Sequence, residues 1–137
     1  MTGDLITALE ATRDAAGPDP VARMEALVRT HVLLHTDRRD EAFVANSELR
    51  SLRPADRAAV VAQRDKVLAI FRAVAAEGLA AGRFACAHPA DTTIAILTMC
   101  TSVAGWFRGD GRETPATIAD RYAALALRML DRRDPAD

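Results

Sequence analysis

Prolines placed at expected helix starts divide this sequence into helical segments. Asp19-Pro20, Arg53-Pro54, His88-Pro89 and Thr114-Pro115 each put a proline at a first helical position, where its missing N–H breaks no intrahelical hydrogen bond. Between these points apolar residues recur at three- and four-residue spacing, and the alternating pattern of β-strands is almost absent. The sequence therefore predicts an all-α chain.

The caps and stops predict six helices. The first runs from Asp4 to about Ala16, and the longest begins at Pro54 and continues to a glycine stop at Gly82, which makes it about 42 Å long at 1.5 Å per residue. The other four cover residues 20–36, 37 or 40 to 52, 91–107 and 115–131. Residues 133–137 are expected to form a frayed tail. No repeat or linker divides the chain, so we expect residues 1–137 to form a single domain.

The composition restricts the kind of core that the chain can form and the kinds of partner that it can bind. The 137 residues include 29 alanines and only 4% aromatic residues, so the core must form between closely packed helices with small side chains. The 18 basic residues are balanced by 19 acidic ones, giving a net charge of −1. A protein that binds nucleic acid or an anionic membrane usually has a cationic surplus. We therefore expect no nucleic-acid contact and no membrane contact from this chain.

The sequence has no feature that would direct the chain to a membrane or out of the cell. The N-terminal residues alternate charged and apolar side chains, unlike a secretion signal. The longest weakly polar stretch, residues 92–107, has 16 residues, fewer than the ~20 that span a bilayer. Two cysteines, Cys86 and Cys100, are more typical of a reduced protein than of a disulfide framework. We predict a cytoplasmic protein.

Few residues are arranged for catalysis or metal binding. His31 and His35 lie one helical turn apart and could both bind a metal, but no third ligand is evident and Val32 replaces the glutamate of an HExxH motif. The alternative is that His31 is a satisfied core residue and that His35 lies at a helix end, where a partly positive ring is favourable. Cys86 and Cys100 have no flanking base, so Cys100 is expected to be a small buried side chain. We expect no enzyme activity, no cofactor and no metal.

Two other segments indicate binding surfaces. Asn46 and Arg50 lie one turn apart on the third expected helix and could address a carbonyl, carboxylate or phosphate group. Equally, Arg50 and Glu48 could form surface ion pairs while Asn46 bonds to neighbouring helices. Trp106 and Phe107 are the largest side chains in a segment of small residues, and such aromatics anchor a core or an interface. The two apolar helices nearest the C-terminus have more apolar surface than one small bundle needs for its core, so self-association is expected.

Four segments point to a known family. They read HVLLHTDRRDEAFVANSELRSLRP, RDKVLAIFRAVAAEGLAAGRF, AILTMCTSVAGWF and ADRYAALALRML, and the likeness covers residues 5–132. They resemble the C-terminal domain of TetR-type transcriptional regulators. More narrowly, VANSELRSL at residues 44–52, the EGxxxGxF pattern at 77–84 and the MCT…GW segment at 99–106 are similar to the branch that senses acyl-CoA thioesters.

The resemblance implies a six-helix TetR-like ligand-binding bundle that forms a homodimer. Its last two helices would pair with those of the second copy as a four-helix interface. In that family an N-terminal module of about fifty residues with a helix-turn-helix contacts DNA. None precedes Leu5 here, so no DNA-binding residue is expected, and the chain is either a fragment or a product that lost this module. The implied interface residues are Trp106, Tyr122, Leu125 and Met129.

The resemblance also implies an effector pocket between the second, third, fourth and fifth expected helices. The function implied is effector sensing and dimerisation, with a small apolar or acyl-CoA-like ligand controlling DNA binding in a full-length regulator. The alternative is a stand-alone helical protein that forms heterodimers with a regulator and modulates it without binding DNA itself. Asn46 or Arg50 would lie near the polar end of the pocket, and its other lining residues would be Met24, His31, Phe43, Phe71, Met99 and Val103.

Overall fold

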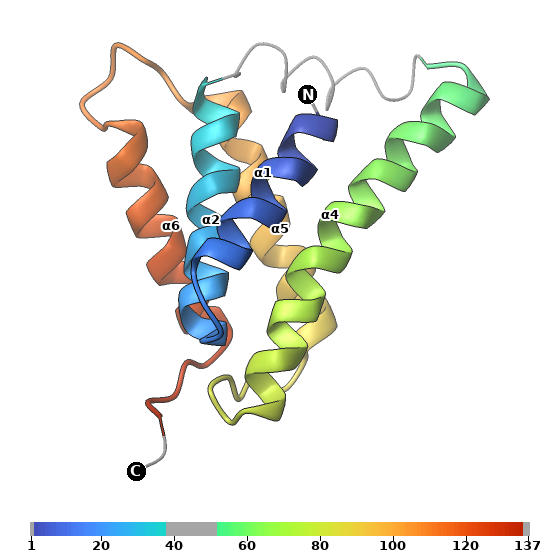
Figure 1. The fold of residues 1–137 in the computed structure, drawn as a ribbon. Helices are drawn as coiled ribbons and strands as arrows, with labels where there is room; N and C mark the ends of the chain where they lie inside the picture. The colour runs from blue at the N-terminus through green and yellow to red at the C-terminus, as the bar shows by residue number, and fades with distance from the viewer. Residues whose placement is uncertain (1, 38–51, 136–137) are drawn as a thin grey trace.

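The structure is a computed structural model that describes residues 2–37 and 52–135. Within these ranges the chain forms helices and no β-strand, which confirms the all-α prediction. The expected helix over residues 37 or 40 to 52 lies outside the described residues, so five helices are described where six were expected. They are α1 (Thr2–Ala15), α2 (Pro20–Asp37), α4 (Pro54–Ala80), α5 (Pro89–Trp106) and α6 (Pro115–Met129) (Figure 1).

Capping residues set several of these boundaries. The Asp19 carboxylate accepts a hydrogen bond of 3.3 Å from the backbone N–H of the second residue of α2, as a helix cap does. The Thr114 hydroxyl accepts a hydrogen bond of 3.1 Å from the backbone N–H of Thr117 at the start of α6. Helix α1 differs from the prediction because it begins at Thr2, so Asp4 lies inside its first turn. A carboxylate is favourable there beside the positive end of the helix dipole.

Replacing Thr114 with alanine tests the cap of α6. The change removes the acceptor for the Thr117 N–H, and the loss of such a cap typically costs about 1 kcal/mol. We expect the free energy of unfolding, measured by urea denaturation, to fall by about that amount. Thr114→Ser keeps the hydroxyl and should retain most of the wild-type stability, so equal losses in the two variants would contradict this role.

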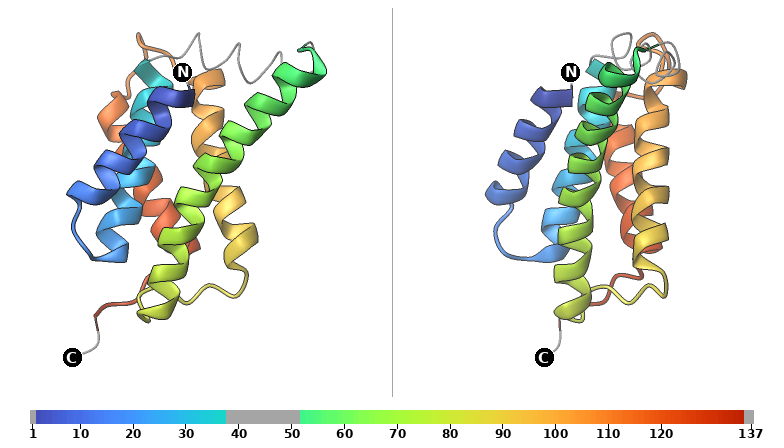
Figure 2. Two further views of the ribbon diagram at one scale, coloured as in Figure 1. Left: turned by 45° about the vertical axis from the view of Figure 1, so that its right-hand side comes forward. Right: turned by 90° about the vertical axis from the view of Figure 1, so that its right-hand side faces the viewer.

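Helix α2 lies at the centre of the bundle and packs against each of the other four described helices. Seen from the side, α1 lies on one side of α2 and α4, and α5 and α6 lie on the other (Figure 2). Because α2 is covered on several sides, Met24, Leu27 and Val28 have no exposed surface. Among the helices of the described ranges, none has the length and apolar content needed to cross a bilayer.

The C-terminal ends of α4 and α6 share one type of helix stop. Beyond α4, Gly82 adopts a φ of +70° and the Arg83 N–H donates to the carbonyl of Gly78 at 2.8 Å. This is the Schellman arrangement that glycine favours, because glycine has no Cβ to oppose a positive φ. Beyond α6, Asp131 takes the same role with a φ of 55°. Phe84 is only 2% exposed and lies against Gly78, so its ring covers the end of α4.

The two segments that follow these helix ends are hydrogen-bonded to each other. The Ala85 N–H donates to the Leu130 carbonyl at 3.1 Å, and the Arg133 N–H donates to the Arg83 carbonyl at 2.8 Å. The Arg83 side chain returns a bond of 2.9 Å from its Nε to the Arg133 carbonyl. Arg133 was expected to be the first residue of a frayed tail. In the structure its backbone N–H and its carbonyl are both hydrogen-bonded to Arg83. We call residues 83–85 and 130–133 the C-terminal seam.

Candidate functional site

Two buried histidines lie in the last two turns of α2. The exposed fractions of His31 and His35 are 2% and 4%, and their rings stack with centroids 4.2 Å apart and planes at 22°. The ring of Phe71, on α4, meets His31 edge-on at 5.8 Å and 88°. The Nε2 atom of His31 is 3.1 Å from the hydroxyl oxygen of Thr101 on α5. His31 therefore lies where α2, α4 and α5 face one another.

The two histidines differ in how their hydrogen-bonding atoms are satisfied. His35 donates from Nδ1 to the backbone carbonyl of His31 at 2.8 Å. In contrast, Nδ1 of His31 is buried and has no hydrogen-bond partner in the described part of the chain. A buried polar group left unpaired costs about 1–3 kcal/mol. His31 thus holds an unmet hydrogen-bonding atom inside the core.

Burial keeps the titratable groups of this region uncharged. Desolvation lowers the pKa of His31 well below its ordinary value, and the neighbouring His35 lowers it further. Desolvation also lowers the pKa of His35, an effect opposed by its hydrogen bond to the His31 backbone. Both rings are therefore neutral at pH 7. Cys100 on α5 is buried too, and desolvation raises its pKa to about 12, so its thiol stays protonated and unreactive.

The structure buries both histidines, but the core interpretation holds only in part: Nδ1 of His31 has no partner in the described residues, and His35, in the last turn of α2, has a lowered pKa and is not partly positive. Within residues 2–37 and 52–135, no group of three His, Cys, Asp or Glu side chains could hold a metal ion. His31 bonds to Thr101 and His35 to its own helix, and these partners are structural.

Besides His31, four of the predicted effector-binding residues are described, and all four belong to the hydrophobic core or pack against it. Met24, Phe71 and Val103 have no exposed surface and belong to the same hydrophobic core, and Met99 is partly buried against that core. His31 contacts Phe71 directly. The three remaining predicted residues lie outside the described ranges: Phe43, Asn46 and Arg50.

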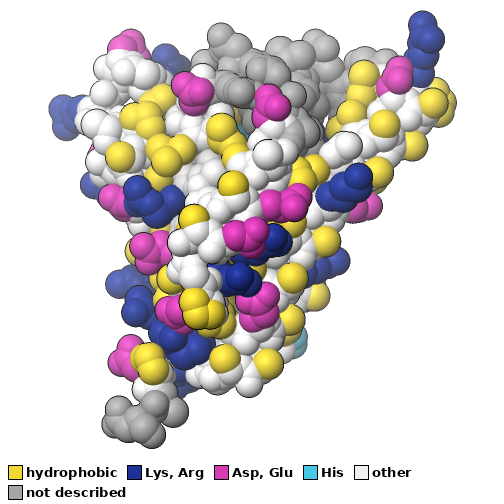
Figure 3. Space-filling view, in the orientation of Figure 1, with side chains coloured by type: hydrophobic (Ala, Val, Ile, Leu, Met, Phe, Trp, Pro, Cys, Tyr) yellow, Lys and Arg dark blue, Asp and Glu magenta, His cyan; other side chains and the backbone are white. Residues whose placement is uncertain are grey.

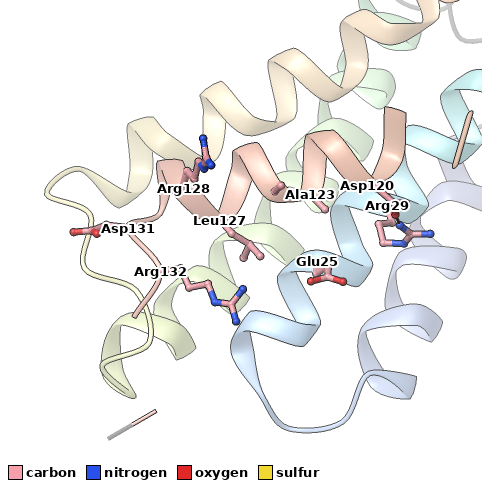
Figure 4. Close-up of a pocket in the computed structure, with 9 residues that line it drawn as sticks. Glu25, Arg29, Asp120, Ala123, Leu127, Arg128, Asp131 and Arg132 are labelled. Atoms are coloured by element: carbon pink, nitrogen blue, oxygen red, sulfur yellow. Dashed lines mark ion pairs between the residues drawn. The ribbon is translucent and has the colours of Figure 1, made fainter. Parts of the chain in front are cut away.

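A groove of about 660 Å³ lies elsewhere, between α2 and α6 (Figure 4). Arg29 of α2 and Asp120 of α6 form an ion pair across it. None of the predicted effector-binding residues that the structure describes lines this groove. Sequence reasoning missed it because only the packing of α6 on α2 brings its charged residues together. The other residues that line it are Glu25, Ala123, Ala124, Leu127, Arg128, Asp131 and Arg132.

Charges of both signs are mixed on the surface seen in Figure 3. Basic and acidic side chains are interspersed over α1, α2 and the lower half of α4, without a broad patch of one sign on this face. Some of them pair between helices: Arg23 of α2 lies 3.2 Å from Glu77 of α4. Arg83 of the C-terminal seam pairs with Asp19 at the start of α2.

The predicted interface residues lie on exposed parts of α5 and α6. The exposed fractions of Trp106, Leu125 and Met129 are 47%, 45% and 36%. Tyr122 is partly buried, its ring centroid lies 6.2 Å from that of Trp106, and burial raises the pKa of its phenol. Ile94 of α5 is 46% exposed and was not among the predicted residues. We call these five residues the α5–α6 face.

Between Ile94 and Trp106 the exposed side of α5 is uncharged. Thr98 and Ser102 are exposed and lie at four-residue intervals between them. Their hydroxyls donate to backbone carbonyls of the preceding turn, each at 2.7 Å. Because these hydroxyls are satisfied within the helix, the surface needs no polar partner at these positions. Ile94 could not be identified from the sequence, because α5 is apolar on nearly all sides and its pattern does not separate exposed from buried positions.

The chain is similar to proteins of one known family. Residues 17–130 match the family model described as the tetracyclin repressor-like, C-terminal domain. The chain belongs to this TetR family of C-terminal domains. The match covers most of the chain and agrees with the resemblance found in the sequence.

Two solved regulators share the fold of this TetR-like domain. One is a bacterial regulatory protein of the TetR family from Rhodococcus RHA1, with a TM-score of 0.84 and 31% identity over 97% of this chain and 72% of that protein. The other is PfmR, a TetR family transcriptional regulator from Thermus thermophilus, with a TM-score of 0.81 and 26% identity over 96% and 73% of the two chains. A search of curated proteins found no significant match. Both solved relatives are described as regulatory proteins of the TetR family.

Proposed function

We propose that this TetR-like domain is the effector-sensing and dimerisation module of a transcriptional regulator. The observation that carries the proposal is the α5–α6 face. Four large apolar side chains on it keep between 36% and 47% of their surface exposed, beside an uncharged strip of small residues. Grouped exposed apolar side chains of this kind mark protein interfaces.

A second copy of the chain, related by a two-fold axis, is the partner that suits this face. Pairing α5 and α6 with the same helices of the other copy gives an isologous four-helix contact. Trp106 and Leu125 would then lose their contact with water, at a gain of about 25 cal/mol for each Å² of apolar surface covered. The small side chains of Thr98 and Ser102 would let the paired helices approach closely.

The proposed effector site lies between α2, α4 and α5, together with the expected helix at residues 37–52. Its support is the neutral ring of His31, which is buried and contacts the ring of Phe71 on α4. An apolar ligand with one polar group suits such surroundings. The resemblance of residues 77–84 and 99–106 to the acyl-CoA-sensing branch favours an acyl-CoA. In a full-length regulator, this ligand would shift the population between two spacings of the DNA-binding modules.

Sedimentation velocity of the wild type and a set of variants tests the dimer. We expect a wild-type dimer at micromolar concentration, and a dissociation constant raised about thirtyfold in Trp106→Ala, because truncation of a central aromatic residue typically costs about 2 kcal/mol or more. Leu125→Glu should be monomeric while keeping its helical content, since Leu125 is 45% exposed in the single chain. Val61→Glu is the matched control, because Val61 is 42% exposed on α4, away from this face.

The outcomes separate the candidate functions. A Leu125→Glu variant that remains dimeric would place the interface elsewhere. Native mass spectrometry of freshly purified protein reports the subunit count and any retained ligand together, and titration with decanoyl-CoA tests the acyl-CoA assignment. A wild-type chain that is monomeric and carries no ligand would favour the alternative, a helical protein that forms heterodimers with a regulator.

A further inference from the structure

The α5–α6 face is uneven, because α6 presents large side chains where α5 presents small ones. On α6, Leu125 and Met129 are exposed and lie about one helical turn apart. On α5, Thr98 and Ser102 are exposed at the same four-residue spacing. Their hydroxyls donate to carbonyls of their own helix, so neither residue needs a polar partner. The two helices therefore offer projecting apolar side chains and shallow uncharged positions at matching intervals.

The contact between Trp106 and Tyr122 shows how these positions are aligned. Helices α5 and α6 run side by side in opposite directions (Figures 1 and 2), and the two ring centroids lie 6.2 Å apart. Ser102 lies about 6 Å before Trp106 along α5, and Leu125 lies about 4.5 Å beyond Tyr122 along α6. Because the helices are antiparallel, both steps lead the same way from the ring contact. Ser102 and Leu125 are therefore level to within about one helical turn, as are the next exposed residues.

A two-fold axis can pair the α5–α6 face with itself in two ways. If the axis crosses the helices, α5 lies on α5 of the other copy and α6 on α6, so large side chains meet large ones and small meet small. If the axis runs along the helices, α5 lies on α6 of the other copy at an unchanged level, so large side chains meet small ones. The core of an interface packs as densely as a protein interior. The second pairing fills the shallow positions of α5 and avoids a collision between large side chains.

We propose that the two-fold axis runs along the helices, so that Leu125 of each copy packs on Ser102 of the other and Met129 packs on Thr98. This inference rests on the proposed dimer and adds which helix of the second copy covers which. The axis also keeps the start of α1 at the same end of both copies. The modules that the proposed function joins to the N-terminus would therefore lie together at one end of the dimer.

Moving the large side chain from α6 to α5 tests this pairing by sedimentation velocity. Ser102→Leu adds apolar surface, yet it should raise the dissociation constant about tenfold or more, because two large side chains then compete for one space. Leu125→Ala should raise it about tenfold through lost burial. The double variant Ser102→Leu/Leu125→Ala again has one large and one small side chain at each contact, so its dissociation constant should lie within about threefold of the wild type. Both residues are exposed in the single chain, so circular dichroism should show unchanged helical content.

Cysteine cross-linking locates the contact independently of affinity. In a Cys86→Ser background, copies with Thr98→Cys and copies with Met129→Cys should form a disulfide when they are mixed and oxidised, while neither variant should do so alone. Val61→Cys is the matched control, because Val61 is 42% exposed on α4, and it should form no disulfide with either variant. Cys100 is buried and stays in place throughout.

The outcomes separate the pairing from the dimer itself. Recovery of the dimer in the double variant, with a disulfide formed only in the mixture, supports an axis along the helices. A disulfide formed by Thr98→Cys alone, without recovery in the double variant, would place α5 on α5 and overturn the inference while the proposed dimer stands. Wild-type affinity in Ser102→Leu would overturn it as well. A monomeric wild type would contradict the proposed dimer and this pairing together.

Discussion

Replacing Gly78 with alanine is expected to lower the free energy of unfolding by about 3 kcal/mol. An added Cβ at this position would overlap Cδ2 and Cε2 of the Phe84 ring and lie 2.8 Å from its Cγ. Phe84 is 2% exposed and sits within the C-terminal seam, so its ring has little room to move away. For a chain of this size the loss corresponds to a fall of about 10 °C in melting temperature.

A second glycine and a second substitution serve as controls for this prediction. Gly109→Ala should melt with the wild type, because a Cβ there would have no heavy atom within 4 Å apart from its neighbours in the chain. Combining Gly78→Ala with Phe84→Ala should cost less than the sum of the two single changes, since removal of the ring relieves the overlap. Additive losses, or a Gly78→Ala variant with wild-type stability, would show that the two residues are not packed together.

Mild acid is expected to produce the second large loss of stability. Burial lowers the pKa of both His31 and His35. In the folded chain these two rings therefore stay neutral near pH 6.5, where histidines of the unfolded chain bind protons. The stability that this difference contributes is present above pH 6.5 and is lost as the pH falls toward the lowered pKa values. Each histidine that stays neutral in the folded chain lowers the free energy of unfolding by up to about 1.4 kcal/mol for each pH unit below 6.5. Between pH 7.5 and pH 5 we expect a total loss of about 3 kcal/mol.

Urea denaturation between pH 7.5 and pH 5, at one fixed protein concentration, measures this loss. The groups that face the pair from α4 and α5, Phe71 and Thr101, do not titrate in this range. The double variant His31→Phe/His35→Phe should therefore show a flatter dependence on pH than the wild type. A double variant with the wild-type slope would assign the pH dependence to other groups.

Much of the fold could be predicted because local chemistry determines where helices begin and end. Asp19 and Thr114 accept backbone N–H bonds at the starts of α2 and α6, and Gly82 ends α4 with a positive φ. These interactions involve residues that are close in sequence. The C-terminal seam could not be predicted, because its bonds join residues such as Arg83 and Arg133, which come together only after α5 and α6 have packed.

The candidate site was predictable where one side of a helix is distinctly apolar. His31 falls on the apolar stripe of α2, and the structure places it in the core. Helix α5 is apolar on nearly all sides, so its sequence could not show that Ile94 is exposed while Ile96 is buried. The unmet Nδ1 of His31 was also hidden, since it depends on how Thr101 is placed by the packing of α5 against α2.

The C-terminal seam has a mechanical consequence for the bundle. It fixes α4 to α6 at one end of the molecule, while the first turns of α4 extend away from the other helices at the opposite end, where α1 begins (Figure 1). Helix α4 has 27 residues and is therefore about 40 Å long. A rotation of about 5° about the seam would move its far end by about 3 Å. The seam is therefore the point about which α4 would rotate. A small change in packing around His31 would become a larger displacement at the N-terminal end of α4, on the side of the domain where α1 begins.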